Sequence, residues 1–254
     1  MTDYSIDITR KEYPATASTS AHIAIKNLHL TLKQNEFVCL VGPSGCGKTT
    51  LMNIVAGIDQ NYEGTINLGT LSQTDNKVAY VFQEPRLLPW RSVIQNIHLV
   101  LDDPNAPHNT KLIEELLELM EITHIRDHYP GQISLGMARR VALVRAFVVQ
   151  PQILLMDEPF VSLDERTAQR IRQRLLETWQ TQPHTILFVT HDIREAIYLA
   201  DRIVFLSQAP SNVINEVKVT IPRHNRTDEH SIEAFRQSLK RIGSKTKNYS
   251  GATK

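Results

Sequence analysis

Residues 42–49 of the 254-residue chain read Gly-Pro-Ser-Gly-Cys-Gly-Lys-Thr, which fits the pattern G-x-x-x-x-G-K-[ST] at every fixed position. A short run of strand type precedes this loop, and residues 50–57 read as a helix that ends at a glycine. Glycines let backbone N–H groups turn toward a polyphosphate, and a helix N-terminus adds partial positive charge. Lys48 would reach the β- and γ-phosphates, and the Thr49 hydroxyl would ligate Mg²⁺. The loop therefore predicts a nucleoside triphosphate site made by Gly42, Pro43, Ser44, Gly45, Cys46, Gly47, Lys48, Thr49 and Thr50.

Two acids follow a second apolar run, Ile153-Leu-Leu-Met156. Such a run predicts a central strand that delivers Asp157 and Glu158 at its C-terminal edge, where open α/β sheets bind ligands. Asp157 would hold Mg²⁺ through water, and Glu158 would polarise the water that attacks the γ-phosphate. The alternative is an acidic strand end that only caps the next turn.

The elements around these motifs alternate in type, which predicts an α/β core interrupted by a helical insertion. Short apolar runs indicate strands, whereas residues 91–149 are helical in pattern, and Asp164 can N-cap a helix that runs to about Thr181. The expected strands are residues 23–30, 37–41, 64–68, 78–82, 153–156, 185–189 and 202–206.

Composition narrows the class of protein. The formal net charge is +1, so electrostatics gives no reason to expect nucleic acid or an anionic membrane surface as a partner. The two cysteines, Cys39 and Cys46, lie in the strand and the loop, where a disulfide would distort the loop, so we expect free thiols in a reducing compartment. No stretch reaches the roughly 18 uninterrupted apolar residues of a membrane span. We therefore expect a soluble, cytoplasmic chain.

Over about residues 10–225, the chain resembles the ATPase subunit of an ABC (ATP-binding cassette) transporter. The motifs come in the family's order, and the resemblance implies ATP and Mg²⁺ as ligands. It makes Gln83, in Val81-Phe-Gln-Glu84, the residue that senses Mg²⁺, and His191, in Phe188-Val-Thr-His-Asp192, the residue that contacts the γ-phosphate. Ser162-Leu-Asp164 would communicate between two paired ATPase domains. Taken singly, Gln83 could bond a turn, Asp164 could be a helix cap and His191 a polar strand end.

The resemblance implies a P-loop NTPase (RecA-like) core with an antiparallel β subdomain and a helical signature subdomain. The ATPase domain would span residues 1–243, with its core at about 21–90 and 151–225, the helical subdomain at about 91–150, and a disordered tail at 244–254. Such ATPases stack adenine on an aromatic residue upstream of the loop, and Tyr13 lies in about the right region. A surface tyrosine is the alternative.

One segment departs from the family pattern. The signature Leu-Ser-Gly-Gly-Gln/Met is here Ile133-Ser-Leu-Gly-Met137, so Leu135 replaces a glycine while Ser134, Gly136 and Met137 remain as nucleotide-binding candidates. In the family this loop closes over the γ-phosphate held by the partner domain. A leucine forced to φ > 0 would be strained by roughly 1–3 kcal/mol. We therefore expect weakened hydrolysis, unless the leucine adopts ordinary backbone geometry.

The run Leu87-Leu-Pro-Trp90 resembles the ATPases of nitrate/sulfonate/taurine-type importers, whose membrane subunit docks on the segment after the glutamine. The resemblance implies an importer for a small solute, a second ATPase subunit, two transmembrane permease subunits and, indirectly, a solute-binding protein. It places the chain on the cytoplasmic face of a bacterial inner membrane. Whether the ATPase pair is a homodimer or a heterodimer, and which solute moves, stays open. Trp90 could instead be a core residue of the helical insertion.

Two other classes of protein remain as alternatives. A soluble ABC-type ATPase that acts on DNA or ribosomes would need long coiled coils or tandem cassettes with a basic surface, and the sequence shows neither. A nucleotide-binding regulatory or structural subunit with little turnover is prompted by Leu135, whereas the presence of Lys48, Glu158 and His191 argues against it.

Overall fold

The structure, a computed structural model, describes residues 3–15, 20–69, 78–161 and 163–245. The chain divides into two compact units. Unit 1 comprises residues 1–72 and 185–254, and unit 2 comprises residues 73–184.

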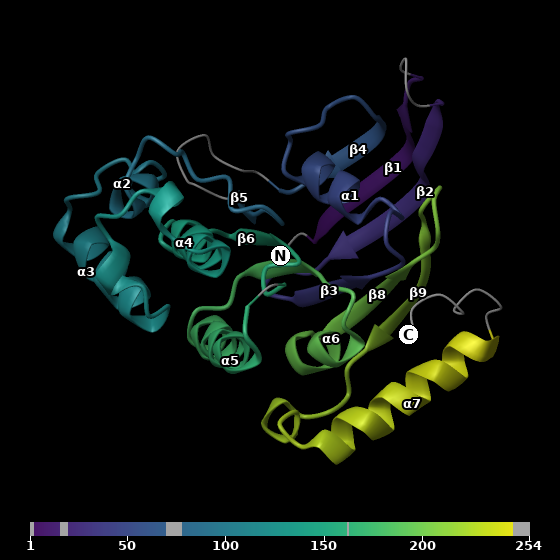
Figure 1. The fold of residues 1–254 in the computed structure, drawn as a ribbon. Coiled ribbons are helices and arrows are strands. Elements are labelled where there is room, and N and C mark those ends of the chain that lie inside the picture. The colour runs from purple at the N-terminus through teal and green to yellow at the C-terminus, as the bar shows by residue number, and fades with distance from the viewer. Residues whose placement is uncertain (1–2, 16–19, 70–77, 162, 246–254) are drawn as a thin grey trace. The chain divides into compact units, whose positions relative to one another are not determined.

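Unit 1 contains an antiparallel sheet in the order β2-β1-β4 (Figure 1). Buried and more exposed residues alternate in the first half of β1, where Tyr4, Ile6 and Ile8 are buried. The strands are β1 (Tyr4–Tyr13), β2 (His22–Leu32) and β4 (Glu63–Asn67). This confirms the predicted antiparallel sheet, although β1 was not among the expected strands.

The second sheet region of unit 1 has the strand order β7-β3-β8-β9. The first three run parallel and β9 runs antiparallel to β8. Their bounds are β3 (Phe37–Val41), β7 (Thr185–Val189), β8 (Arg202–Leu206) and β9 (Val213–Lys218). All residues of β3 and β7 are buried, as continuous apolar runs predict for central parallel strands.

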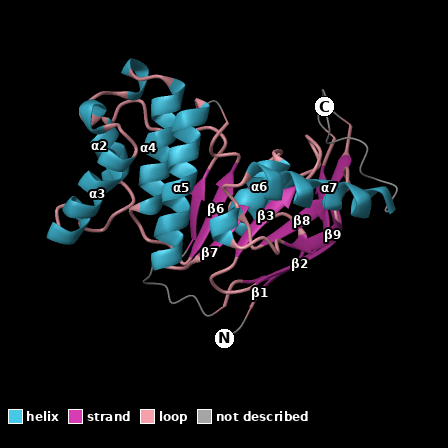
Figure 2. Ribbon diagram, turned by 90° about the horizontal axis from the view of Figure 1, so that it is seen from below, coloured by secondary structure: helices cyan, strands magenta, loops and turns pink. Residues whose placement is uncertain are grey.

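The α-helices in the described residues of unit 1 are α1 (Lys48–Val55), α6 (Ile193–Leu199) and α7 (Glu229–Lys245). Figure 2 shows α6 lying over β3 and β8, on the side away from β1 and β2. A short 3-10 helix, Arg223–Asn225, precedes α7. The helix α7 was not predicted, and it includes the first residues of the expected tail; residues 246–254 lie outside the described part of the chain.

A charged cluster joins the two sheets of unit 1 at Arg202. Its guanidinium donates to both carboxylate oxygens of Glu36 (2.9 and 2.8 Å), to the carbonyl of Thr31 (2.6 Å) and to Glu216 (2.5 Å). Burial raises the pKa of Glu36, but the hydrogen bonds from Arg202 and from the backbone of Lys33 leave it below its ordinary value. The cluster fixes the start of β3, the strand that leads into the phosphate loop.

Unit 2 holds a parallel pair of strands, β5 (Val78–Val81) and β6 (Ile153–Asp157), with a group of helices. The helices are α2 (Val93–His98), α3 (Pro107–Leu119), α4 (Leu135–Phe147) and α5 (Glu165–Thr181), with 3-10 turns at Thr123–Ile125 and Pro130–Gln132. These elements confirm the predicted helical region and the strand before Asp157. Among the described residues, no helix has both the length and the apolar character needed to cross a membrane.

Candidate functional site

The phosphate loop joins β3 to α1 in unit 1, and its backbone requires glycine. Gly45 and Gly47 have φ of 74° and 103°, a conformation that residues with a side chain rarely adopt. A Cβ on Gly47 would lie 3.2 Å from the carbonyl oxygen of Ala24. Gly47 is also the N-cap of α1 and offers no side chain to the first-turn N–H groups. The N-terminus of α1 is therefore a place where an anion can bind.

Lys48 closes the loop. Its side chain is buried, and its ammonium donates to the carbonyl oxygens of Gly42 (2.9 Å) and Pro43 (2.8 Å). The Sγ atom of Cys46 lies 3.9 Å from the same nitrogen. Burial raises the pKa of the Cys46 thiol, and both cysteines are free, as the sequence predicted. The positive charge of Lys48 is thus held inside the turn of the loop, where phosphate oxygens would need a cation.

His191 lies on the same sheet edge as the phosphate loop. It follows β7, which runs parallel to β3 with Leu40 opposite Val189. Parallel strands end at a common edge, so His191 and Gly42 emerge from neighbouring strands. The backbone N–H of Thr190 donates to the carbonyl of Leu40 (3.2 Å), which fixes this arrangement. Within unit 1, the structure therefore brings His191 and the loop together.

Tyr13 also lies next to the phosphate loop. Its hydroxyl is 3.2 Å from the Oγ1 atom of Thr50, in the first turn of α1. The residue is half-buried, so the alternative of a surface tyrosine stays open. Binding of a base by Tyr13 stays a prediction.

Unit 2 brings Gln83, Asp157 and Glu158 to one edge of its own strands. The strands β5 and β6 run parallel with Val81 opposite Met156, so the residues that follow them leave the same edge. Asp157 is only 2% exposed, whereas Gln83 is exposed. Glu158 has φ of 48°, which is uncommon for a residue with a side chain and costs of order 1–3 kcal/mol. Strain of this kind at a carboxylate next to a buried aspartate motivates a functional assignment.

The carboxylate of Glu158 acts on the charge of Arg139, which is also in unit 2. Burial lowers the pKa of Arg139, in α4, and the carboxylate of Glu158 opposes that shift. The Nε and Nη1 atoms of Arg139 are buried without a hydrogen-bond partner in the described part of the chain. No sequence motif points to Arg139, because its closeness to Glu158 depends on how α4 packs and not on a spacing in the sequence.

Asp164 N-caps α5, as predicted, with its Oδ1 atom accepting from the N–H of Thr167 (3.0 Å). Hydrogen bonds from the side chain and from the backbone of Thr167 lower the pKa of Asp164. The cap is therefore real, and a nucleotide-related role for Asp164 stays a prediction. Ser162, in the same predicted loop, lies outside the described residues.

The signature segment forms the start of α4. Ser134 is the N-cap, and its Oγ atom accepts from the N–H of Met137 (3.2 Å). Leu135, Gly136 and Met137 make the first turn, and the Leu135 side chain is 55% exposed. Leu135 is not among the residues with positive φ, so the expected backbone strain is wrong. That the Leu135 side chain needs room at the contact with a partner domain stays a prediction.

The segment after Gln83 exposes Trp90, with 70% of its surface accessible. The alternative that Trp90 is a core residue therefore fails. Asn96, fully buried in α2, holds the loop that carries Trp90: its side chain accepts from the N–H of Leu88 (2.8 Å) and donates to the carbonyls of Leu88, Arg91 and Ser92 (3.2, 3.0 and 3.0 Å). Sequence reasoning missed Asn96, since an amide within a helical run has no distinctive spacing.

Two aromatic residues before Gln83 and an arginine after it make stacking contacts with one another. The rings of Tyr80 and Phe82 are stacked with centroids 4.0 Å apart, and the Arg86 guanidinium lies 4.0 Å from the centroid of Phe82. Burial raises the pKa of Tyr80, and the charge of Asp157 raises it further, so the phenol stays neutral. The stack fixes the backbone from which Gln83 projects.

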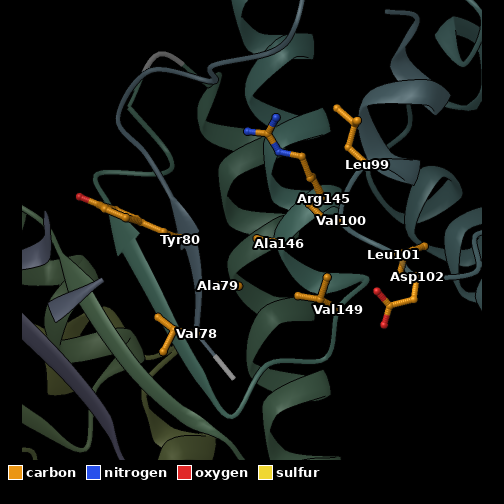
Figure 3. A pocket seen from close by; sticks show the side chains of 10 residues that line it. All are labelled: Val78, Ala79, Tyr80, Leu99, Val100, Leu101, Asp102, Arg145, Ala146 and Val149. Carbon is orange, nitrogen blue, oxygen red and sulfur yellow. The ribbon is translucent and has the colours of Figure 1, made fainter. Parts of the chain in front are cut away.

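A cavity of about 380 Å³ opens beside the segment that follows Gln83 (Figure 3). Its walls come from β5, the loop after α2 and the end of α4. Arg145 lines it and donates to the carbonyls of Pro85 (2.9 Å) and Arg86 (3.1 Å). The cavity wall and the exposed segment after Gln83 are thus parts of one hydrogen-bonded structure.

The predicted Mg²⁺ ligands are of the right chemical type. Thr49, Gln83 and Asp157 supply a hydroxyl, an amide oxygen and a carboxylate, all hard oxygen donors that suit Mg²⁺. Among the described residues, no group of three or more His, Cys, Asp and Glu side chains could hold a metal ion by itself. An ion bound mainly through substrate phosphates needs no such group.

Comparisons with known proteins agree with this geometry. Residues 25–161 match the sequence family described as ABC transporter. The aliphatic sulfonates import ATP-binding protein of Bacillus subtilis is 34% identical over 241 residues, which is 92% of either chain. The bicarbonate transport ATP-binding protein CmpD of a Synechocystis strain is 35% identical over 237 residues, or 90% of this chain and 82% of the relative.

Solved structures show the same fold. One is an ATP-binding cassette described as dimeric, in a post-hydrolysis state, bound to ADP and Pi. It is 30% identical in sequence and has a TM-score of 0.74, and the match covers 85% of this chain and 98% of the solved chain. The predicted fold, with a P-loop NTPase core, is therefore confirmed.

The geometry of Leu135 predicts the effect of restoring glycine. Because Leu135 lies in a helical first turn, Leu135→Gly should lower the free energy of unfolding by about 0.5–1 kcal/mol, since glycine is the poorer helix former. Urea denaturation of the full chain followed by circular dichroism measures this change. Leu135→Ala is the matched control and should unfold close to wild type. A glycine variant more stable than wild type would mean that the leucine is strained.

Proposed function

The chain belongs to the ABC transporter family of ATP-binding proteins, and on that premise we propose that it is the ATP-hydrolysing subunit of an importer for a small nitrate-, sulfonate- or taurine-like solute. The observation that carries this proposal is the phosphate loop, with its glycine-dependent backbone, its uncapped helix N-terminus and Lys48 held within the turn. Relatives named for sulfonate and bicarbonate transport support a small anionic solute.

The proposed chemistry divides among a few side chains. The loop and Lys48 bind the phosphates, and His191, on the neighbouring strand, contacts the γ-phosphate. Thr49, Gln83 and Asp157 hold Mg²⁺, which would supply charge neutralisation on the phosphates. Glu158 orients and polarises the attacking water. The residues of unit 2 are assigned to the same nucleotide by the order of motifs along the chain.

Two copies, or this chain with a different ATPase subunit, would pair around two ATP molecules. In that pairing Ser134, Gly136 and Met137 of one subunit meet the nucleotide held by the other, and Asp164 lies near the contact. The dimeric state of the solved cassette supports the pairing. The helical geometry of Leu135 leaves the backbone N–H groups of the first turn of α4 in place, so a subunit with little turnover is the less supported alternative.

We place the membrane partner at residues 87–90 and the cavity beside them. Trp90 is exposed on a loop that Asn96 holds rigidly, and exposed aromatic residues on rigid supports act as anchors in interfaces. Arg145, which lines the cavity, donates to the carbonyls of Pro85 and Arg86, directly before this segment. Two permease subunits would dock here, with a solute-binding protein acting outside, which puts the chain at the cytoplasmic face of a bacterial cell membrane.

The catalytic assignment predicts the effect of Glu158→Gln. The variant should bind ATP normally, because the loop is unchanged, but hydrolyse it at least about 10²-fold more slowly, because the water loses its base. Steady-state ATPase assays on the reconstituted transporter measure this. The variant should also form a dimer that depends on ATP, which size-exclusion chromatography detects.

Glu118→Gln, the same change at an exposed position of α3, is the control and should keep wild-type turnover. Hydrolysis by the Glu158→Gln transporter within a few-fold of wild type would remove Glu158 from the mechanism.

The docking assignment predicts that Trp90→Ala weakens co-purification with the permease. Truncating an aromatic anchor commonly costs 2 kcal/mol or more, which is a loss of about thirtyfold in affinity. ATP binding by the isolated subunit should stay unchanged. Ile58→Ala, which removes an exposed apolar side chain of unit 1, is the control. Complex formation that is equal for wild type and Trp90→Ala would show that the permease binds elsewhere.

A further inference from the structure

Three groups surround the side chain of Tyr13. The hydroxyl lies 3.2 Å from the Oγ1 atom of Thr50. The ring of His22, its cross-strand partner, is stacked at a centroid distance of 5.2 Å with an angle of 28° between the planes. The ammonium of Lys11, two residues earlier on β1, lies 4.7 Å from the ring centroid. Tyr13 therefore has a hydrogen bond at its tip and two partners at its ring.

Lys11 is the most deeply buried member of this group. Its side chain is only 3% exposed, which is unusual for a lysine. The Nζ atom forms an ion pair with Asp59 (2.8 Å) and donates to the carbonyl of Asn61 (2.7 Å). Asp59 is itself held, because its Oδ1 atom accepts from the N–H of Asn61 (3.1 Å). His22, by contrast, is exposed and can move aside.

These contacts tie Tyr13 to both ends of α1. Thr50 belongs to the first turn of the helix, and Asp59 belongs to the loop that follows its last turn. That loop is attached to the helix, since the N–H groups of Ile58 and Asp59 both donate to the carbonyl of Asn53 (2.9 and 3.1 Å). The helix that presents its N-terminus to phosphate therefore also fixes the position of the aromatic ring.

We infer that Lys11 is a positioning residue for the nucleobase: its buried ammonium, clamped to the loop after α1, holds the Tyr13 ring at a set place relative to the phosphate loop. This inference rests on the proposed nucleotide site. A base joined to a triphosphate reaches only a limited region once the phosphates are bound. A ring already fixed in that region stacks without losing rotamer freedom on binding, so the pre-organisation appears as affinity.

The test separates base binding from phosphate binding. Dissociation constants of the full chain are measured by calorimetry, in the presence of Mg²⁺, for a non-hydrolysable ATP analogue and for inorganic tripolyphosphate. The dissociation constant for tripolyphosphate divided by that for the ATP analogue isolates what the base contributes, and this ratio falls when the base binds less well. Lys11→Met should lower this ratio about threefold to tenfold, as expected for loss of a partly desolvated cation–π contact, while the affinity for tripolyphosphate stays unchanged. Lys11→Arg should recover part of the ratio.

Two further variants keep the inference open to refutation. Lys26→Met, the same change at an exposed position of β2, should leave both affinities at wild-type values. Asp59→Asn leaves Lys11 in place but removes its ion-pair partner. It should lower the ratio less than Lys11→Met does, and it provides the measurement if Lys11→Met fails to fold.

Tyr13→Ala distinguishes failure of this inference from failure of the proposed site. If Tyr13→Ala lowers the ratio but Lys11→Met and Asp59→Asn do not, Lys11 does not position the base, although the base site stands. An equal fall in both affinities for Lys11→Met would show that Lys11 only supports the fold, which also overturns the inference. If Tyr13→Ala leaves the ratio unchanged, the base does not bind at Tyr13 and the proposed base site itself is wrong.

Discussion

The site in unit 1 depends on a tight backbone turn closed by a buried cation. The loop between β3 and α1 keeps its shape because Gly45 and Gly47 adopt positive φ and because Lys48 bonds to the carbonyls of Gly42 and Pro43. Both flanks of the turn are fixed. On one side β3 is wholly buried between β7 and β8, and on the other α1 is held through Tyr13 and Lys11. A loop on rigid supports can present its N–H groups to an anion without reorganising.

In unit 2 the candidate residues are also held by rigid elements, but they are an amide and two carboxylates instead of a phosphate loop. A parallel strand pair delivers Gln83 and the Asp157-Glu158 pair to one edge, while stacking of Phe82 and Arg86 and the hydrogen bonds of Arg145 define the segment that follows. The same segment continues to Trp90 over the buried amide of Asn96. A residue proposed to sense Mg²⁺ and a surface proposed to meet the membrane subunit are therefore parts of one short, well-supported stretch of chain.

Much of this could be predicted from the sequence, because the chemistry depends on local patterns. An unbroken apolar run before a glycine loop or before two acids predicts a buried strand, and β3 and β6 are such strands. The missed elements lack that signal. In β1, Arg10 and Lys11 interrupt the alternation. The sequence of α7 is largely polar, and Ile232 and Leu239 are the buried residues among those of its side chains that the structure describes.

Side-chain roles that arise from packing could not be predicted in the same way. The order of residues does not show that Lys11 is buried against Asp59. Nor does it show that Asn96 holds the loop that carries Trp90. The electrostatic interaction between Arg139 and Glu158 has no sequence signal either. The expected strain at Leu135 was wrong for a related reason. The motif specifies a glycine, but the backbone angle is set by the helix that Ser134 caps.

The central claim about this molecule is that its phosphate loop binds ATP through Lys48. Equilibrium binding of ATP to the purified full chain, wild type against Lys48→Ala, tests that claim, with circular dichroism confirming that both chains are folded. Loss of charge-assisted hydrogen bonds to phosphate should weaken binding by about tenfold to a hundredfold. Equal affinity in a folded Lys48→Ala chain would contradict the account.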